Sequence, residues 1–464
     1  MNDETEYDLV GVGLGPFNLG LAALAEPLAG LRTLFLDARP GFAWHPGLLL
    51  EGAQLQVPFL ADLVSLVDPT SRWSFLSYLR EQDRLFPFYF AERFHVPRRE
   101  YDHYCRWVAE SLPSCRFGAR VDGLRWSPRA GRFLLDTTDP TTGVTGRVAA
   151  RHVVLGVGTQ PVVPEPLAHL VGDHVFHAGD YLDRLPALRG ARDVTVVGSG
   201  QSGAEVFLDL LRRAPEHHWR VRWLTRSPAF APMEYSKLGL EHFTPDYTAY
   251  FRDLPESTRD ALVPAQWQLY KAISAETIDE IHTLLYERSV GGERPEVSLT
   301  ANVAIEAARA TADGYLLSCR ETRQDRAFEL RTERVVLATG YAARRPALLD
   351  PLVDLVDWDQ RGRYRVDGDY RVTLAPEVSG SLFVQNAELH THGVGTPDLG
   401  LGAWRAATIL NAVTGGTAYR LPTRTAFTGF GVPDDAITGS GVPDDAITDE
   451  SPVAEGAPCP RTSP

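Results

Sequence analysis

Cysteine is scarce in this chain. The four cysteines among 464 residues, Cys105, Cys115, Cys319 and Cys459, form no CxxC pair and no spacing typical of a metal site. We therefore expect a reduced, cytoplasmic protein without a bound metal. The lack of a spaced cysteine pair also argues against a disulfide reductase, whose chemistry needs two neighbouring thiols.

Basic residues and long apolar runs are scarce as well. Lys and Arg number 46 against 60 Asp and Glu, so the formal net charge is -14 and no basic stripe is available for a phosphate backbone. No apolar run reaches the roughly 18 residues of a membrane-spanning helix. The N-terminus, MNDETEYDLV, is acidic and unlike a secretory signal. These features argue against a nucleic-acid partner and against a membrane partner.

The sequence does contain apolar segments that run directly into glycine. Residues 7–12, 194–197 and 334–338 are predicted to form buried strands. The first two lead into glycine-rich turns and then helical patterns, which is how a dinucleotide-binding unit begins. Two such units predict an α/β protein with two Rossmann-like domains.

The first glycine turn lies in YDLVGVGLGPFNLGLAAL. Gly11 permits the tight turn after the strand, and Gly13 lets the backbone approach a pyrophosphate at the following helix N-terminus. At the third position of the GxGxxG pattern this chain has Gly15 and Pro16. Asp37 ends the next predicted strand, LFLD, where a carboxylate is suited to bind a ribose hydroxyl. We expect this unit to bind a dinucleotide.

The second glycine turn, in DVTVVGSGQSGAEVFLDLL, matches the GxGxxG spacing in full with Gly198, Gly200 and Gly203. The next predicted strand ends in Arg226 rather than in an acid. Arginine at this position is suited to pair with a 2′-phosphate, which favours NADPH over NADH. A surface arginine without a ligand is the alternative interpretation.

A third strand meets a turn of small residues in VVLATGY, residues 335–341. The residues expected at a cofactor here are Ala338, Thr339, Gly340 and Tyr341. Two dinucleotide sites together with this turn predict a flavoprotein that takes hydride from NADPH. A binding protein without enzymatic activity would not need all three features.

Seven motifs between Tyr7 and Gly416 carry a resemblance to a known family. They are GVGLGPFNLGLA, WHPG, LQVPFLADLVSLVDPTSRWSFLSYL, RREYDHYCRW, GSGQSGAE, LATGY and QNAELHTHGVGTPDLGLGAWR. Together they resemble the microbial N-hydroxylating flavin monooxygenases, which hydroxylate the terminal amine of ornithine, lysine, putrescine or cadaverine on the way to hydroxamate siderophores. Baeyer–Villiger and sulfur monooxygenases carry FxGxxxHxxxW or a near variant between the glycine turns. Here VFHAGDYLDRL arranges its phenylalanine and glycine differently.

The resemblance implies a defined chemistry. FAD is reduced by NADPH, dioxygen adds at flavin C4a to give a hydroperoxide, and a neutral amine attacks the distal oxygen. The protein supplies positioning and the exclusion of water. The resemblance therefore implies an oxidoreductase that uses O2 and a small aliphatic amine, with FAD and NADPH as cofactors. It also implies a homo-oligomer, often a tetramer in this family.

The resemblance places further side chains at these cofactors. They are Arg98 and Gln56 as catalytic residues, Trp44 and His45 in a loop over the flavin, Gln201 and Ser202 at the NADPH phosphates, and His392, with His390, near flavin or NADP+. Most of these side chains could instead have a purely structural role. Arg98 would then form a surface ion pair, Trp44 a core contact, and the Gln201–Ser202 pair a helix cap, while the histidines would be structural.

The substrate pocket is expected around LQVPFLADLVSLVDPTS. In ornithine-hydroxylating relatives a lysine that holds the substrate carboxylate stands where this chain has Ala61, and two asparagines stand where it has Leu240 and Tyr270. A substrate carboxylate facing these three residues would be an uncompensated charge, which disfavours ornithine. A diamine, cadaverine or putrescine, fits best, and L-lysine is the alternative.

A diamine also needs an acid for its second, cationic amine. Asp62, Glu234 and Glu241 are the candidates, and we assign Glu241 to the substrate site. For each of the three, a solvated carboxylate is the alternative.

The domain organisation follows from these motifs. We expect an FAD domain at 1–170 and 335–420, an NADPH domain at 171–230 and 295–334, and a helical substrate element at 231–294. Helices are predicted at 68–79, 102–111 and 257–288. Residues 423–464, in which GVPDDAIT occurs twice, are predicted to be a disordered acidic tail.

Overall fold

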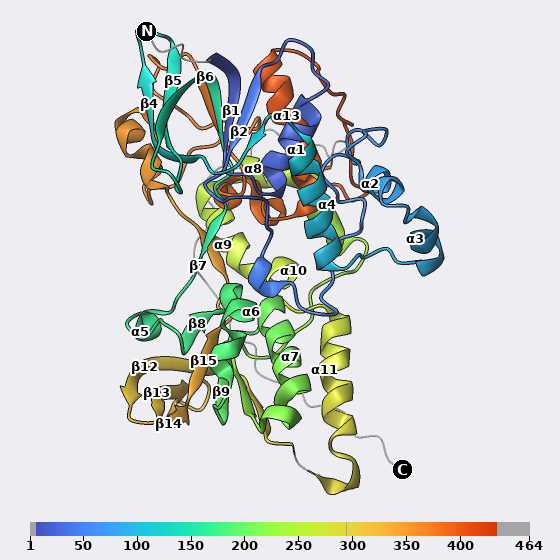
Figure 1. The fold of residues 1–464 in the computed structure, drawn as a ribbon, viewed down its shortest axis with the longest axis vertical. Coiled ribbons are helices and arrows are strands. Elements are labelled where there is room, and N and C mark those ends of the chain that lie inside the picture. The colour runs from blue at the N-terminus through green and yellow to red at the C-terminus, as the bar shows by residue number, and fades with distance from the viewer. Residues whose placement is uncertain (1–5, 294, 434–464) are drawn as a thin grey trace, which may run out of the picture. The chain divides into compact units, whose positions relative to one another are not determined.

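We describe the protein from a computed structural model that places residues 6–293 and 295–433 (Figure 1). Residues up to Thr428 form one compact unit. Its first sheet has the order β3-β2-β1-β6-β5-β4, with β17 also beside β6. The strands are β1 (Glu6–Val12), β2 (Thr33–Leu36), β3 (Cys115–Arg116), β4 (Arg120–Ser127), β5 (Arg132–Thr138), β6 (Thr145–Leu155) and β17 (Ser381–Val384). β4 and β5 extend this parallel sheet with antiparallel pairs.

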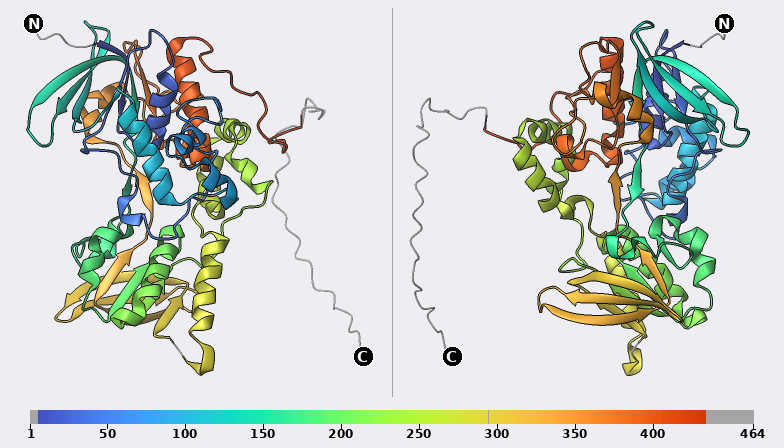
Figure 2. Two further views of the ribbon diagram at one scale, coloured as in Figure 1. Left: turned by 45° about the vertical axis from the view of Figure 1, so that its right-hand side comes forward. Right: turned by 90° about the vertical axis from the view of Figure 1, so that its left-hand side faces the viewer.

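A second, parallel sheet has the order β11-β10-β9-β15-β8. Its strands are β8 (Val175–His177), β9 (Asp193–Val197), β10 (Arg220–Leu224), β11 (Val297–Thr300) and β15 (Arg334–Leu337). An antiparallel sheet of β12 (Val303–Thr311), β13 (Gly314–Glu321) and β14 (Arg326–Thr332) packs beside it, as the right-hand view of Figure 2 shows. The two predicted Rossmann-like units are therefore both present as parallel sheets.

The chain crosses between the two sheets on a short antiparallel pair, β7 (Thr159–Pro161) and β16 (Tyr341–Ala343). The predicted domain boundary at 335 is wrong, because β15 pairs with β9 and β8 in the second sheet. The chain returns to the first part only at β16. The apolar run 334–338 indicated a buried strand, but both sheets bury such strands, so the pattern alone did not say which sheet it joins.

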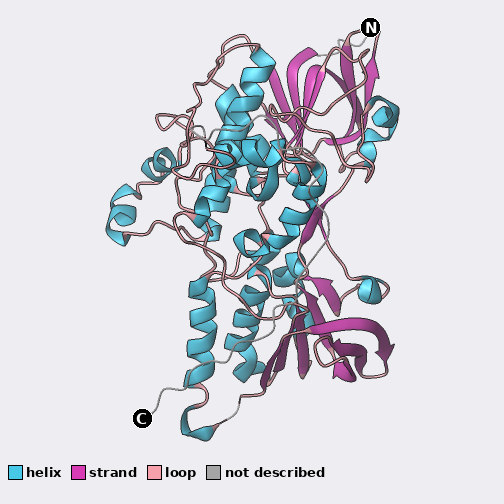
Figure 3. Ribbon diagram, turned by 180° about the vertical axis from the view of Figure 1, so that it is seen from behind, coloured by secondary structure: helices cyan, strands magenta, loops and turns pink. Residues whose placement is uncertain are grey.

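Helices cover the sheets in separate layers (Figure 3). They are α1 (Pro16–Ala25), α2 (Phe75–Glu81), α3 (Leu85–Ala91), α4 (Arg98–Ser111), α5 (Glu165–Ala168), α6 (Tyr181–Arg184), α7 (Gln201–His217), α8 (Pro245–Asp253), α9 (Glu256–Ala265), α10 (Trp267–Tyr270), α11 (Ala275–Glu287), α12 (Leu389–His392) and α13 (Gly402–Thr414). α1 packs against α13 and α4 in one apolar core, and α7 packs against α11 in another. Nearly every residue of α1 is buried, as expected for a helix that is apolar all round.

Two predicted helices begin elsewhere. The helix predicted at 68–79 begins only at Phe75, because Ser74 is the N-cap and accepts a hydrogen bond from Ser77 N at 3.2 Å. Asp68 instead accepts from Thr70 N and closes a turn. The helix predicted at 102–111 is α4, which starts four residues earlier at Arg98, after Pro97.

The predicted helix 257–288 is three helices, α9, α10 and α11. Ser274 caps α11 by accepting from Thr277 N and separates it from the two helices before it. α8 and α9 pack beside α12, whereas α11 packs on α7. The helical segment expected as one substrate element thus contacts both parts of the chain.

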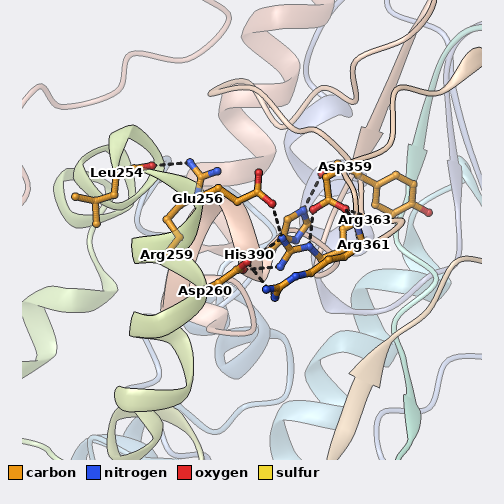
Figure 4. A network of polar contacts seen from close by, with 9 residues as sticks. Leu254, Glu256, Arg259, Asp260, Asp359, Arg361, Arg363 and His390 are labelled. Carbon is orange, nitrogen blue, oxygen red and sulfur yellow. Dashed lines mark hydrogen bonds and ion pairs between the residues drawn. The ribbon is translucent and has the colours of Figure 1, made fainter.

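A charge network holds α9 in place (Figure 4). The Arg363 guanidinium bonds Asp260 at 2.6 Å, Glu256 at 3.2 Å and Asp359 at 2.6 Å. Next to it, His390 lies 2.7 Å from the Tyr364 carbonyl oxygen. These contacts favour the structural alternative for His390. Networked ion pairs of this kind restrain a helix more firmly than isolated surface pairs do.

Part of the predicted disordered tail is held by hydrogen bonds. Backbone N–H groups of Thr425 and Ala426 donate to Asp246 at 2.9 and 3.0 Å, and those of Phe427 and Thr428 donate to Glu241 at 3.1 and 2.8 Å. The predicted tail therefore begins too early. Residues 434–464, with most of the GVPDDAIT repeat, lie outside the described residues. Among the described residues, no helix combines the length and apolarity needed to cross a membrane.

Candidate functional site

The first glycine turn joins β1 to α1 and leaves room above the helix. Gly13 has φ +88°, and a Cβ there would lie 2.4 Å from the Gly156 oxygen, so no other residue fits. Gly15 is the N-cap of α1, so no side chain there caps the first-turn N–H groups. A Cβ built on Gly15 would have no atom within 4 Å, so the space beside it is open. The first-turn N–H groups and the helix dipole thus face space that suits an anionic group.

Asp37 closes one side of this turn. Its carboxylate accepts hydrogen bonds from Leu14 N at 2.8 Å and from the Arg39 guanidinium at 2.8 and 2.9 Å. Burial opposes the charged form, but the Arg39 and Leu14 donors outweigh it, so the pKa of Asp37 lies below its usual value. Arg39 was not singled out in the sequence. The ribose contact of Asp37 stays a prediction.

Buried polar groups converge on the first turn of α1 from the segment after β17. Gln385 Nε2 donates to Asn18 Oδ1 at 2.7 Å, and Arg405 lies 4.6 Å over the Phe17 ring. Arg405 also pairs with Glu388 at 3.1 Å, both side chains being fully buried. Gln385 Oε1 and Thr396 Oγ1 are buried without a hydrogen-bond partner.

Such unpartnered atoms are costly unless a ligand satisfies them. Together with the open helix N-terminus, they fit a dinucleotide such as FAD. Burial, followed by nearby Arg405, lowers the pKa of His392 well below its usual value, so its imidazole is neutral. His392 stacks on Tyr370 with ring centroids 4.5 Å apart. Its cofactor contact stays a prediction.

The WHPG loop meets the ATGY turn. The His45 ring lies 5.7 Å from the Tyr341 ring and 5.1 Å from the Trp44 ring. Trp44 also packs edge-on against Tyr101 at 5.0 Å, in agreement with the core alternative. Burial and the charge of Arg98 lower the pKa of His45 to about 4, so this ring is neutral near pH 7.

The ATG turn lies against the second glycine turn. Gly198 has φ +116°, and a Cβ there would lie 2.2 Å from the Ala338 oxygen. Gly340 O accepts a hydrogen bond from Val162 N at 2.9 Å, and Thr339 Oγ1 donates to Val162 O at 2.5 Å. The predicted residues 338–341 therefore lie where the chain passes from one sheet to the other.

The second glycine turn opens α7 in the same way. Gly200 is the N-cap of α7, so neither Gln201 nor Ser202 caps that helix. The Gln201 side chain instead accepts from Ser274 N at 2.8 Å and donates to Thr277 Oγ1 at 3.0 Å at the start of α11, which favours a structural role for Gln201. A Cβ on Gly203 would lie 2.3 Å from Gly198 O, which explains the third glycine of the fingerprint. Arg226 follows β10 and is exposed. This arrangement fits a second dinucleotide.

Arg98 forms a buried ion pair with Glu205 on α7, 107 residues away. Nη1 donates to Glu205 Oε2 at 2.8 Å and to Leu48 O at 2.9 Å, and Nη2 donates to Glu205 Oε1 at 2.7 Å. Gln201 Nε2 also donates to Glu205 Oε1 at 2.9 Å. The surface ion pair considered for Arg98 is therefore wrong, because the pair is buried. Its role at the flavin stays a prediction.

The expected substrate residues are spread over three elements. Ala61 is buried beside Gly400, Leu240 lies in the short helix Gly239–Phe243, and Tyr270 ends α10. Tyr270 Oη donates to Val263 O at 3.3 Å. Gln56 is only five residues before Ala61 in the sequence. Its buried Nε2 has no hydrogen-bond partner. These assignments stay predictions.

The three acids considered for the second substrate amine differ in their hydrogen-bond partners. Both oxygens of buried Asp62 are filled by Val64 N, Ser65 N, Ser65 Oγ and Phe75 N, at 2.6 to 2.9 Å, so Asp62 is wrong as a partner for a substrate amine. Glu234 accepts from Ser236 N at 2.6 Å on the surface. The Glu241 carboxylate accepts the two tail amides and stays an untested assignment. Over the described part of the chain, no group of three or more His, Cys, Asp or Glu is placed to hold a metal.

Comparisons with known proteins bear directly on this site. A family model described as L-lysine 6-monooxygenase/L-ornithine 5-monooxygenase matches residues 5–343. Putrescine N-hydroxylase of Shewanella oneidensis is 41% identical over 428 residues, which is 92% of this chain and 85% of that one. The FAD-bound cadaverine monooxygenase DfoA of Erwinia amylovora is 39% identical with a TM-score of 0.89, covering 93% of this chain and 100% of that one. The ornithine N-hydroxylase KtzI of Kutzneria sp. 744, with reduced FAD, NADP+ and L-ornithine, is 29% identical with a TM-score of 0.83, covering 88% and 99%.

The Arg98–Glu205 pair generates a stability prediction. Replacing Arg98 by Met, or Glu205 by Leu, leaves one buried charge without a partner, which costs about 3–5 kcal/mol. The double variant removes both charges and should recover much of that loss. Urea unfolding of the four proteins measures the coupling. Losses that simply add in the double variant would contradict this account of the pair.

Proposed function

The chain belongs to the L-lysine 6-monooxygenase/L-ornithine 5-monooxygenase family, and from that premise we propose that it N-hydroxylates one terminal amine of an aliphatic diamine, cadaverine or putrescine. It is a flavin-dependent N-monooxygenase with FAD and NADPH as cofactors. Its hydroxylated product serves hydroxamate siderophore biosynthesis. The observation that carries the diamine is buried Ala61, at the position where the family resemblance implies a lysine in ornithine-hydroxylating enzymes.

When bound and reduced by NADPH, FAD supplies activated dioxygen for transfer of one oxygen atom to the amine nitrogen. The residues of this chain bind, orient and exclude water. The open N-termini of α1 and α7 suit the two pyrophosphates. Trp44, His45 and Tyr341 form an aromatic cluster, here called the cover, where the chain passes between the first and the second sheet. The Arg98–Glu205 pair fixes α7 against that cover and is a positioning contact.

The substrate class is tested by measuring how tightly NADPH consumption is coupled to amine hydroxylation. We expect cadaverine and putrescine to give close to one hydroxylamine per NADPH consumed, L-lysine less, and L-ornithine least, because an α-carboxylate has no basic partner at Ala61. The assay measures hydroxylamine and NADPH together in the FAD-loaded enzyme. Tight coupling with L-lysine and none with either diamine would overturn the diamine and leave the family assignment intact.

Arg226 is proposed to bind the 2′-phosphate of NADPH. A hydrogen bond to a charged group contributes about 1.5–3 kcal/mol. Arg226→Ser should therefore raise KM for NADPH by about 10- to 100-fold and leave KM for NADH unchanged, as measured by flavin reduction. Arg323→Ser, at an exposed arginine in the β13–β14 turn, is the control. Equal effects on both nucleotides would show that Arg226 does not read the phosphate.

We propose further that the protein is a homo-oligomer that pairs through α3. The helix buries none of its residues, and Phe86, Tyr89 and Phe90 are 76%, 72% and 73% exposed. Phe94, just after the helix, is 55% exposed. Exposed aromatic side chains in such number mark interaction surfaces. Glu92 and Arg93 adjoin them, so a copy related by a two-fold axis offers both charges in return.

The variant Phe86→Ser/Phe90→Ser should shift the molar mass measured by light scattering to that of a smaller species. Phe427→Ser, which removes an 88% exposed phenylalanine outside α3, is the control and should keep the wild-type mass. An unchanged mass for the double variant would exclude α3 as the interface.

A further inference from the structure

A carboxylate that the sequence did not single out lies beside Ala61. Asp398 stands between η7 (Gly393–Gly395) and the short helix Leu399–Leu401, and its Oδ1 accepts a hydrogen bond from Gly400 N at 2.6 Å. A Cβ built on Gly400 would lie 2.8 Å from Asp398 Oδ1 and 4.0 Å from Ala61 Cβ. The Asp398 carboxylate and the Ala61 methyl group therefore both lie close to Gly400.

Asp398 is not balanced by a cation. Within residues 6–293 and 295–433, the Gly400 amide is its carboxylate's sole hydrogen-bond donor and no Lys or Arg pairs with it. Nearby Arg405 is already paired with Glu388. Burial raises the pKa of Asp398 to about 6, against the Gly400 amide and Arg405. A partly covered carboxylate in such surroundings gains from a cationic ligand.

The same carboxylate also acts electrostatically on Tyr235. Burial, Glu276 and Asp398 together raise the pKa of Tyr235 to about 12, so Asp398 lies within electrostatic reach of that phenol. Tyr235 Oη donates to Gln56 O at 3.3 Å, and Gln56 carries the buried, unpartnered Nε2. Through this hydrogen bond, Tyr235 links the electrostatic surroundings of Asp398 to the backbone of Gln56.

We propose that Asp398 binds the distal ammonium group of the substrate, so that the site accepts a diamine with one neutral and one cationic amine. This inference rests on the proposed function and names the residue behind its specificity. The reacting amine must be neutral, so the second amine carries the single positive charge. A lysine in place of Ala61 would form an ion pair with Asp398 inside the protein. With alanine at position 61, the substrate ammonium group can form this ion pair instead.

The test compares cadaverine with n-pentylamine, which has the same chain and no second charge. Asp398→Asn keeps an oxygen for Gly400 N and removes the charge. We expect KM and the equilibrium dissociation constant for cadaverine to rise by about 10- to 100-fold, since the lost bond is charge-assisted. The corresponding constants for n-pentylamine, and flavin reduction by NADPH, should stay within about twofold. Asp313→Asn, an exposed residue in the β12–β13 turn, is the matched control.

A second variant tests the role of Asp398 without changing Asp398 itself. Ala61→Lys should place an ammonium beside Asp398 and abolish the preference for cadaverine over n-pentylamine, with FAD content and the melting temperature reporting folding. An unchanged cadaverine preference in Asp398→Asn, in an enzyme that still hydroxylates cadaverine, overturns the assignment of Asp398 alone. A wild-type enzyme that hydroxylates neither diamine overturns the proposed function instead.

Discussion

The buried ion pair between Arg98 and Glu205 is the contact on which the arrangement of the site depends. Its two side chains are only 11% and 6% exposed, and they come from α4 beside the first sheet and α7 beside the second. An unpaired charge at this depth costs several kcal/mol, so α7 is strongly held where the pair forms. The same guanidinium binds Leu48 O in the loop that carries His45. One contact thereby fixes both the cover and the second nucleotide turn.

The two glycine turns are built on the same principle and differ in their surroundings. At both, glycine lets the chain turn closely enough for a helix N-terminus to stay open. Beside the first turn lie buried Gln385 and Arg405, whose unpartnered polar atoms suit a ligand. The second follows β9, next to β10, after which comes the exposed Arg226. A permanently held cofactor suits the first turn, and an exchanging nucleotide suits the second.

How far the sequence predicts this structure depends on the range of each interaction. The strands at 7–12 and 194–197 were located within one residue, because an apolar run followed by glycine is a local signal. Glu205 was missed although it lies inside a quoted motif, since its partner stands 107 residues away. The helix expected from Asp68 began at Phe75 because the Asp68 side chain closes a turn with Thr70 and Ser74 caps the helix. Asp398 was missed because only folding brings it to Ala61. Local turns were thus predictable, whereas pairings across the chain were not.

The charge balance around Ala61 explains why so few residues are needed to define a substrate class. Arg405 is fully buried and neutralised by Glu388, and the Asp62 carboxylate is filled by its own loop. Asp398 therefore carries the charge that remains for a ligand, and alanine at 61 leaves it uncompensated. A second amine completes that balance, whereas the α-carboxylate of an amino acid would add a like charge next to Asp398. With Asp398 as the proposed partner of the second amine, an alanine instead of a lysine at position 61 leaves the pocket negative and suited to an ammonium end group.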